Sequence, residues 1–151
     1  MPVELTPSGT RGVVMRKAPR WLMRLAYAVA PLFFKIRGLD TVMLTTLGAR
    51  SGEEHTVQLI PFPEGDGSWL VVASSAGSVK HPAWYYNMAR NPDNIWLETA
   101  GRKIQVEAES LSGQERQAAW DRVVKVWKGY DSYKEKTDRE IPVVRLRPTS
   151  G

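Results

Sequence analysis

The sequence of 151 residues is long enough for a single domain that buries a core of its own. It has no cysteine and only two histidines, which excludes disulfide bonds, thiolate catalysis and cysteine-based metal sites and argues against a metal site of several histidines. Because 21 lysine and arginine residues face 16 acidic ones, the net charge is +5, so the partner is expected to be acidic: a phosphorylated cofactor, an anionic membrane or a nucleic acid.

The N-terminal part of the chain is expected to contain a leader and a helix. Residues 1–18, rich in proline, glycine and basic side chains, predict a flexible leader without the apolar run of a signal peptide. Residues 19–151 are expected to form one domain, which opens with an amphipathic helix over about 19–37. Pro31 is expected to kink or split this helix. Its apolar stretch is too short and too interrupted to span a bilayer, so we predict a cytoplasmic protein.

After residue 41 the pattern becomes β-branched and alternating, which predicts strands. The third strand should be buried, because Leu70 to Ala73 are apolar without a break. Ser112 and Glu115 stand at the spacing of a capping box, which marks the start of a helix. The expected strands are 42–48, 56–62, 68–75, the hairpin 94–111 and 141–148, and the expected helices are 82–92, 112–130 and 130–139. Six or so mostly antiparallel strands with packed helices predict an α+β fold built on a small barrel.

A glycine-rich turn between the first two strands, GARSG (residues 48–52), is the first candidate site. Its glycines free the backbone, so that successive N–H groups can face an anion. Ser51 adds a hydroxyl group, and Arg50 adds a cation that can bind phosphate through two hydrogen bonds. The alternative interpretation is a plain hairpin turn with an exposed arginine.

The segment that leaves the third strand, ASSAGSVKHPAWYYN (residues 73–87), is the second candidate. Its small residues allow a planar ring to lie close to the backbone. The start of the following helix can hold negative charge, with Lys80 and His81 beside it. The alternative interpretation is a connecting loop and a helix whose Trp84 and Tyr85 pack in the core.

Three aromatic residues near the C-terminus are the third candidate. Trp127, Tyr130 and Tyr133 stand three residues apart, so in a helix their rings share roughly one face. A phenol there can donate a hydrogen bond to a carbonyl or nitro oxygen and pass it a proton. The alternative interpretation is an aromatic cluster that packs against the barrel.

The motifs LTTLGARSG, VVASSAG with KHPAWYYNMARNP, and GYDSYKEKTDREIPVV, in this order, resemble the deazaflavin-dependent nitroreductases of actinobacteria, also described as quinone reductases dependent on coenzyme F420. The resemblance runs from about Thr41 to Pro148. It implies an FMN-binding split-barrel-like fold. It also implies that reduced F420 donates hydride to a flat apolar acceptor, which would be a quinone, a nitroaromatic or an α,β-unsaturated carbonyl compound.

The resemblance also implies site residues. The cofactor would contact Arg50, Ser51, Gly52, His55, Gln58, Leu59, Ile60, Pro61, Ala73, Ser74, Ser75, Ala76, Gly77, Lys80, Pro82, Trp84 and Asn87. Trp127, Tyr130 and Tyr133 would bind substrate, and Tyr130, Tyr133 or Ser74 would polarise the acceptor oxygen. Ala49, His55 and Ser75 replace basic residues that are common in the family, and Gln58 replaces a proline. Lys80 and the basic leader are the candidates to restore the lost charge.

Several alternatives stay open. The same barrel could use FMN, heme or biliverdin, or the protein could carry a deazaflavin without catalysing a reaction. Nucleic-acid binding is not expected, because the basic residues are spread along the chain and no binding motif is present. The helix over 19–37 could rest on an anionic bilayer, or pack on the barrel or a partner subunit. We expect a monomer or a homodimer and no metal site.

Overall fold

The structure is a computed structural model that describes residues 3–12, 19–36, 41–74, 77–78, 80–99 and 101–149. These residues form four helices and seven strands: α1 (Arg20–Ile36), β1 (Val42–Leu47), β2 (Glu54–Leu59), β3 (Phe62–Pro63), β4 (Trp69–Val72), α2 (Ala83–Arg90), β5 (Ile95–Thr99), β6 (Arg102–Ser110), α3 (Gly113–Val126), α4 (Gly129–Lys136) and β7 (Val143–Pro148). Each predicted element is present. α1 continues through Pro31, so the proline does not split the helix, and Phe62–Pro63 forms a separate short strand.

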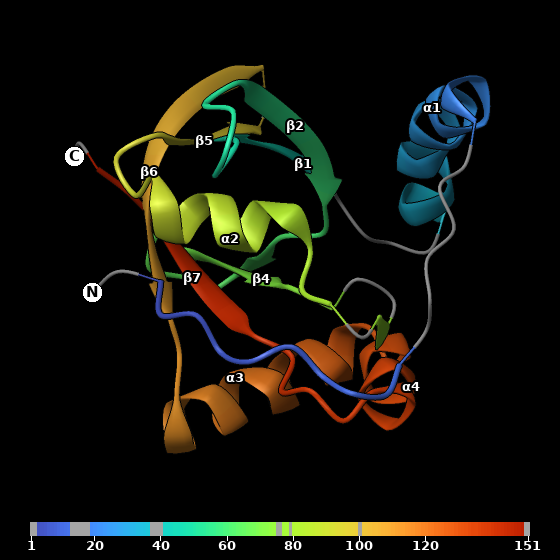
Figure 1. Cartoon of the computed structure of the whole chain (residues 1–151), viewed down its shortest axis with the longest axis vertical. Coiled ribbons are helices and arrows are strands. Elements are labelled where there is room, and N and C mark those ends of the chain that lie inside the picture. The colour runs from blue at the N-terminus through green and yellow to red at the C-terminus, as the bar shows by residue number, and fades with distance from the viewer. Residues whose placement is uncertain are drawn as a thin grey trace.

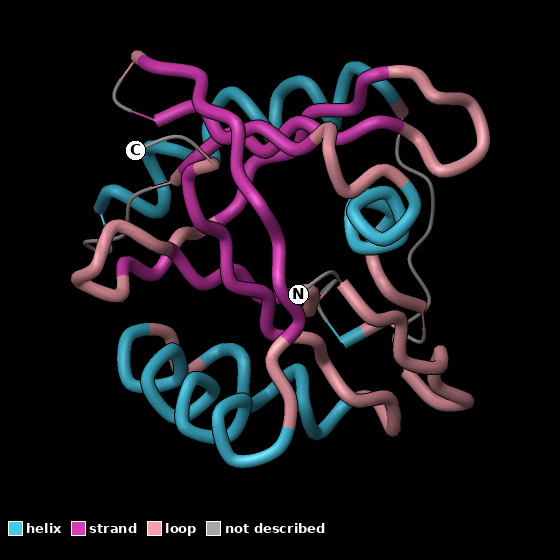
Figure 2. Tube along the Cα trace, turned by 90° about the vertical axis from the view of Figure 1, so that its left-hand side faces the viewer, coloured by secondary structure: helices cyan, strands magenta, loops and turns pink. Residues whose placement is uncertain are grey.

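All seven strands form one antiparallel sheet in the order β2-β1-β5-β6-β7-β4-β3. The long strand β6 belongs to both halves of this sheet, because its residues 102–105 pair with β5 and residues 106–110 pair with β7. The sheet curls around this shared strand into a half-barrel (Figure 2). The predicted α+β split barrel is therefore confirmed, with seven strands where six or so were expected.

Helix α2 lies on the concave side of the curled sheet, between the β1–β5 half and the β4–β7 half (Figure 1). Its Trp84, Tyr85 and Met88 are buried in a core that also contains Leu44 and Leu97. Since each such side chain removes a large apolar area from water, this core holds α2 firmly in place. The interpretation of Trp84 and Tyr85 as core residues is confirmed, although Trp84 also borders the cavity described below.

A second core lies on the other face of β4 and β7, beneath α3 and α4. Leu70 and Val72 of β4 point into it, whereas Val71 between them points into the first core. Successive side chains of a strand face opposite sides, so a strand between two cores must be apolar throughout. The prediction that this strand is buried is confirmed, and the structure adds that it lies between two cores.

The predicted capping box at the start of α3 is wrong. Ser112 occupies the N-cap position but makes no side-chain hydrogen bond to the helix. Glu115 turns instead toward Arg145, whose Nη1 lies 3.2 Å from its Oε2. Arg145 also binds Glu64 at 2.7 Å, so a largely buried guanidinium group holds Glu115 away from the cap.

Residues 3–12, which we call the N-terminal strap, run across the molecule in extended form. Tyr85 donates its hydroxyl hydrogen to the Glu4 carbonyl oxygen at 2.7 Å. The N–H groups of Thr10 and Arg11 each donate to Asp138 Oδ1 at 2.8 Å. Hydrogen bonds from Thr10 and Arg11 lower the pKa of Asp138 to about 2. The sequence assigned this segment to a flexible leader, but its backbone pairs with residues distant in the chain; residues 13–18 lie outside the described part.

Helix α1 stands clear of the sheet and of the other helices (Figure 1). The large apolar side chains described in its residues 21–29 are exposed, with Trp21 at 68%, Leu25 at 54% and Val29 at 52%. An apolar stripe of this kind is typical of a helix that contacts a further surface. No helix in the described part of the chain has the length and apolar character needed to cross a membrane.

Candidate functional site

A cavity of about 840 Å³ opens between the turn that joins β1 and β2 and the first half of α2. It is lined by Ser8, Thr46, Gly48, Ala49, Arg50, Ser51, His55, Thr56, Val57, Lys80, Ala83, Trp84, Tyr86 and Asn87. Its volume lies in the range of pockets that bind small molecules and cofactors. The fold thus brings the first two candidate segments together, and the strap adds Ser8.

The turn at residues 48–52 does not offer its backbone to an anion in the expected way. The Gly52 N–H donates to the Gly48 carbonyl oxygen at 2.9 Å, and the Ala49 N–H donates to Asn87 Oδ1 at 2.9 Å. The Gly48 N–H also donates to the Glu53 carbonyl oxygen at 2.8 Å, so three N–H groups of the turn are occupied within the protein. The side chains of Arg50 and Ser51 remain the candidates to bind an anion.

Gly48 is required for space. A Cβ atom on this residue would lie 2.5 Å from Ser51 Oγ and 3.1 Å from His55 Nε2. The absence of a side chain therefore lets the Ser51 hydroxyl group and the His55 ring converge at the mouth of the turn. Gly52 serves the turn differently: its φ of +71° lies in the left-handed region, which favours glycine.

Asn87 fastens this turn to α2. Its Oδ1 accepts from the Ala49 N–H, and its Nδ2 donates to Thr46 Oγ1 at 3.1 Å. The side chain is buried. One turn further along the helix, Asn91 Nδ2 donates to the Leu47 carbonyl oxygen at 3.1 Å. The predicted cofactor residue Asn87 therefore both borders the cavity and sets the position of the turn opposite.

The charge of the cavity favours an anionic ligand. Arg50 and Lys80 contribute cations from opposite segments, and none of the described residues that line the cavity is acidic. Cations gathered in a concave site with low-dielectric walls raise the local concentration of anions. Trp84 and Val57 add an apolar wall suited to the flat part of a ligand.

Tyr86 is a residue of the cavity that the sequence reasoning missed. Its hydroxyl group lies 3.2 Å from Ser8 Oγ, so helix and strap meet at the rim. Tyr85, its neighbour, points instead into the core. Helical spacing was the signal that could have found it, because Ala83, Tyr86 and Asn87 share one face of α2.

The aromatic residues of the third candidate segment do not line the cavity. The Tyr130 ring packs 5.9 Å from Phe62 and 6.2 Å from Trp120 in the second core, and burial raises the pKa of its hydroxyl group well above the usual range. Trp127 and Tyr133, which are partly exposed, pack against the same cluster. This arrangement agrees with the alternative interpretation of an aromatic cluster, because α4 covers the face of β4 opposite the first core.

The second and third candidate segments meet at Gly77. Its φ is +79°, and a Cβ atom would lie 3.0 Å from both the Tyr133 carbonyl oxygen and the Lys136 Cβ atom. The described cofactor candidates that do not line the cavity are Gly52, Gln58, Leu59, Ile60, Pro61, Ala73, Ser74, Gly77 and Pro82. Of these, Leu59 packs on the first core and Ile60 on the second. Ser75 and Ala76 lie outside the described residues.

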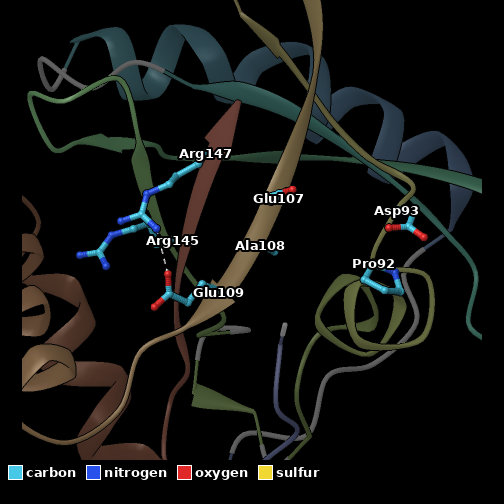
Figure 3. A pocket seen from close by; sticks show the side chains of 7 residues that line it. All are labelled: Pro92, Asp93, Glu107, Ala108, Glu109, Arg145 and Arg147. Carbon is cyan, nitrogen blue, oxygen red and sulfur yellow. Dashed lines mark hydrogen bonds and ion pairs between the residues drawn. The ribbon is translucent and has the colours of Figure 1, made fainter. Parts of the chain in front are cut away.

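Another pocket, of about 250 Å³, lies on β6 and β7 and is less suited to an anion (Figure 3). Both of its arginines are engaged: Arg147 pairs with Glu109 at 3.1 Å, and Arg145 with Glu64 at 2.7 Å. Asp93 adds a further negative charge on the far side (Figure 3). The larger cavity is therefore the better candidate for a functional site.

Comparison with protein families matches the greater part of the chain to one family. The profile of a family described as F420H(2)-dependent quinone reductase matches residues 16–148. A protein of Mycobacterium tuberculosis that bears this name provisionally is 32% identical over 110 residues, which are 73% of this chain and 91% of that protein. A second protein of the same organism, named F420H(2)-dependent quinone reductase, is 29% identical over 70% of this chain and 72% of its own length.

Solved structures agree with this assignment. An F420-H2 dependent reductase, FDR-A, superposes with a TM-score of 0.63 at 36% identity over 71% of this chain and 93% of its own. A structure described as a domain-swapped dimer also has a TM-score of 0.63, with 31% identity over 84% of this chain and 97% of that one. A heme storage protein of Vibrio cholerae shares the fold, with a TM-score of 0.55 at 14% identity.

Proposed function

The chain belongs to the family of F420H(2)-dependent quinone reductases, and on this premise we propose that it transfers hydride from reduced coenzyme F420 to a flat apolar acceptor. The observation that carries the proposal is the cavity, in which Arg50 and Lys80 face a common space without an acidic neighbour among the described lining residues. A cofactor whose tail carries phosphate and carboxylate groups fits this charge.

The residues of the turn and of the segment before α2 would hold the cofactor. Arg50 can bind a phosphate through two parallel hydrogen bonds, and the hydroxyl group of Ser51 and the ammonium group of Lys80 can donate further ones. His55, at the mouth of the turn, can donate from its ring. Lys80 would compensate for the basic side chains that the family resemblance leads one to expect at positions 49 and 55.

Reduced F420 supplies the hydride when bound, so the protein provides orientation, electrostatics and exclusion of water. We propose that Ser74 and Gly77 contact the ring and that Trp127 and Tyr133 bind the acceptor. Tyr133 or Ser74 would polarise the acceptor oxygen, since both side chains are partly exposed. Tyr130 is less suited to this role, because its hydroxyl group is buried.

A quinone is the acceptor that we propose for the natural reaction, since the relatives carry that name. A nitroaromatic or an α,β-unsaturated carbonyl compound has the same flat, electron-poor character. The family assignment favours F420 over FMN, heme or biliverdin as the cofactor.

We propose a homodimer as the assembly, on the precedent of the domain-swapped relative. Cytoplasmic location with peripheral contact to an anionic membrane is a separate proposal. It rests on the exposed apolar side chains of α1 together with its exposed Arg20 and Arg24. Size-exclusion chromatography with light scattering tests the first, and flotation with anionic and neutral vesicles tests the second.

The test of the main proposal is a titration of the purified protein with oxidised and reduced F420, followed by turnover with menadione. We expect saturable binding, and oxidation of the reduced cofactor only when menadione is present. Arg50→Ala should weaken binding, whereas Arg102→Ala, an exposed arginine of the β5–β6 hairpin, should not. Absence of binding would refute the proposal. Binding without turnover by any quinone would leave a deazaflavin carrier.

A further inference from the structure

Arg139, in the link between α4 and β7, is buried and only 6% exposed. Its Nε donates to the Ser78 carbonyl oxygen at 2.8 Å, its Nη1 to that of Ala73 at 3.1 Å, and its Nη2 to that of Ser74 at 2.6 Å. The Nη1 atom also lies 2.9 Å from His81 Nδ1. A single guanidinium group thus forms hydrogen bonds with both ends of the segment that leaves β4.

This arrangement differs from the usual buried arginine. Buried charges in proteins are normally paired with an opposite charge. The ion pairs of the described residues involve Arg116, Arg122, Arg145 and Arg147, and Arg139 takes part in none of them. Backbone carbonyl groups solvate the cation instead, and burial lowers the pKa of Arg139. Such a site needs the planar fork of five N–H groups that only arginine has.

The carbonyl groups that converge on Arg139 would repel one another without it. They point inward from residues 73, 74 and 78, and the Gly77 N–H donates to the Ser74 oxygen at 2.9 Å to close the turn between them. Gly77 sits with no spare room against Tyr133. The guanidinium group therefore joins the described ends of this segment, residues 73–74 on one side and residue 78 on the other.

His81 extends the arrangement to the strap. Because arginine cannot accept a hydrogen bond, His81 Nδ1 is the acceptor, and the proton of the neutral ring lies on Nε2. This Nε2–H donates to the Thr6 carbonyl oxygen at 2.9 Å. Burial, and then the charge of Arg139, lowers the pKa of His81, which keeps the ring in this acceptor form. Two residues further along the strap, Ser8 borders the cavity.

We propose that Arg139 is the positioning residue of the cofactor site: its guanidinium group holds the backbone of residues 73, 74 and 78 and, through His81, the strap in the arrangement that the deazaflavin requires. This inference rests on the proposed function, since Ser74, Gly77 and Lys80 are its cofactor residues. Arg139 itself does not line the cavity.

The test compares Arg139→Lys and Arg139→Ala with Arg116→Ala as a matched control. Arg116, a residue of α3, also donates to a backbone carbonyl group of the same link, that of Ile141 at 2.6 Å, but it pairs with the Glu140 carboxylate. We expect both Arg139 variants to raise the Kd for F420 about tenfold or more, and the control to leave it within about twofold. Added guanidinium ion, against a matched salt control, should restore binding to Arg139→Ala.

A second readout does not depend on the cofactor. In the wild-type protein, nitrogen NMR of His81 should show a proton on Nε2 and an accepting Nδ1. In Arg139→Ala this pattern should be lost, and the His81 pKa should rise, because the neighbouring positive charge is gone. The nitrogen NMR signals of His55, the other histidine, should be the same in both proteins.

These readouts separate the two proposals. If the wild-type protein does not bind F420, the proposed function fails, while the His81 signal still reports whether Arg139 organises the segment. A wild-type Kd in Arg139→Lys would overturn the inference, because a lysine retains the charge without the fork. An unchanged His81 signal in a folded Arg139→Ala variant would overturn it as well.

Discussion

Replacing Asn87 by alanine removes the contact that joins α2 to the turn between β1 and β2. The side chain is 5% exposed and makes two hydrogen bonds, to the Ala49 N–H at 2.9 Å and to Thr46 Oγ1 at 3.1 Å. A neutral intramolecular hydrogen bond contributes a net 0.5–1.5 kcal/mol or so. Ala49 borders the cavity, so water can bind its N–H group in the variant. The full desolvation penalty of an unpaired buried group therefore does not arise. We therefore expect Asn87→Ala to lower the free energy of unfolding by about 2 kcal/mol.

Urea denaturation followed by tryptophan fluorescence measures this change. For a domain of this size the same loss corresponds to a fall of about 4–8 °C in Tm. Thr46→Val supplies the partner for a double-mutant cycle, and its effect and that of Asn87→Ala should not add, since both remove the same bond. A stability of Asn87→Ala within about 0.5 kcal/mol of wild type would refute the reasoning, because that is the scale of an ordinary surface substitution.

Asn87→Asp separates the stability of the turn from the charge of the cavity. A carboxylate oxygen can still accept from the Ala49 N–H, and the hydroxyl group of Thr46 can turn to donate to the other oxygen. We expect a smaller loss of stability than for Asn87→Ala. The added negative charge should nevertheless weaken F420 binding, because it opposes Arg50 and Lys80. Equal F420 affinity in Asn87→Asp and wild type would argue against an anionic ligand in this cavity.

Four further changes test other parts of the structure. Gly77→Ala should lower the free energy of unfolding, measured by thermal or urea unfolding, by about 1–3 kcal/mol, because residue 77 has a positive φ and the added Cβ atom would have contacts of 3.0 Å. Gly65→Ala is the control: its φ is +85° but the space around it is open, so it should lower the free energy of unfolding by less. The pKa of His81 is lowered from 6.5, so its contribution to the free energy of unfolding is present above pH 6.5 and declines as the pH falls below that value. Urea titrations across this pH range should show the decline, and a flat profile would contradict the expectation. The pKa of Glu64 is lowered from 4.5, mainly by its hydrogen bond from Arg145, so stability should fall as the pH drops below 4.5, and Glu64→Gln should flatten this acid-side slope. Tyr133→Phe should reduce turnover with menadione about tenfold to a hundredfold, and unchanged turnover would exclude Tyr133 as the polarising group.

Periodicity and turn chemistry located the elements because they are local properties. The apolar run at β4 predicted a buried strand, and the structure has Val71 in one core and Leu70 in the other. The capping box at Ser112 failed for a non-local reason, since Arg145, thirty residues away in the chain, draws Glu115 to itself. A spacing rule contains no information about such a competitor.

The sequence by itself determined the order of the elements, the basic character of the turn at Arg50 and the family resemblance. All three depend on short stretches of consecutive residues and on their order along the chain. Only the tertiary structure decided which candidates meet. It joined the turn to α2 through Asn87 and placed Tyr130 in a core away from the cavity. It also placed Arg139, to which the sequence analysis gave no role, in contact with the backbone of the segment after β4. Hydrogen bonds between residues some sixty positions apart depend on how the sheet curls, and no local pattern records that curvature.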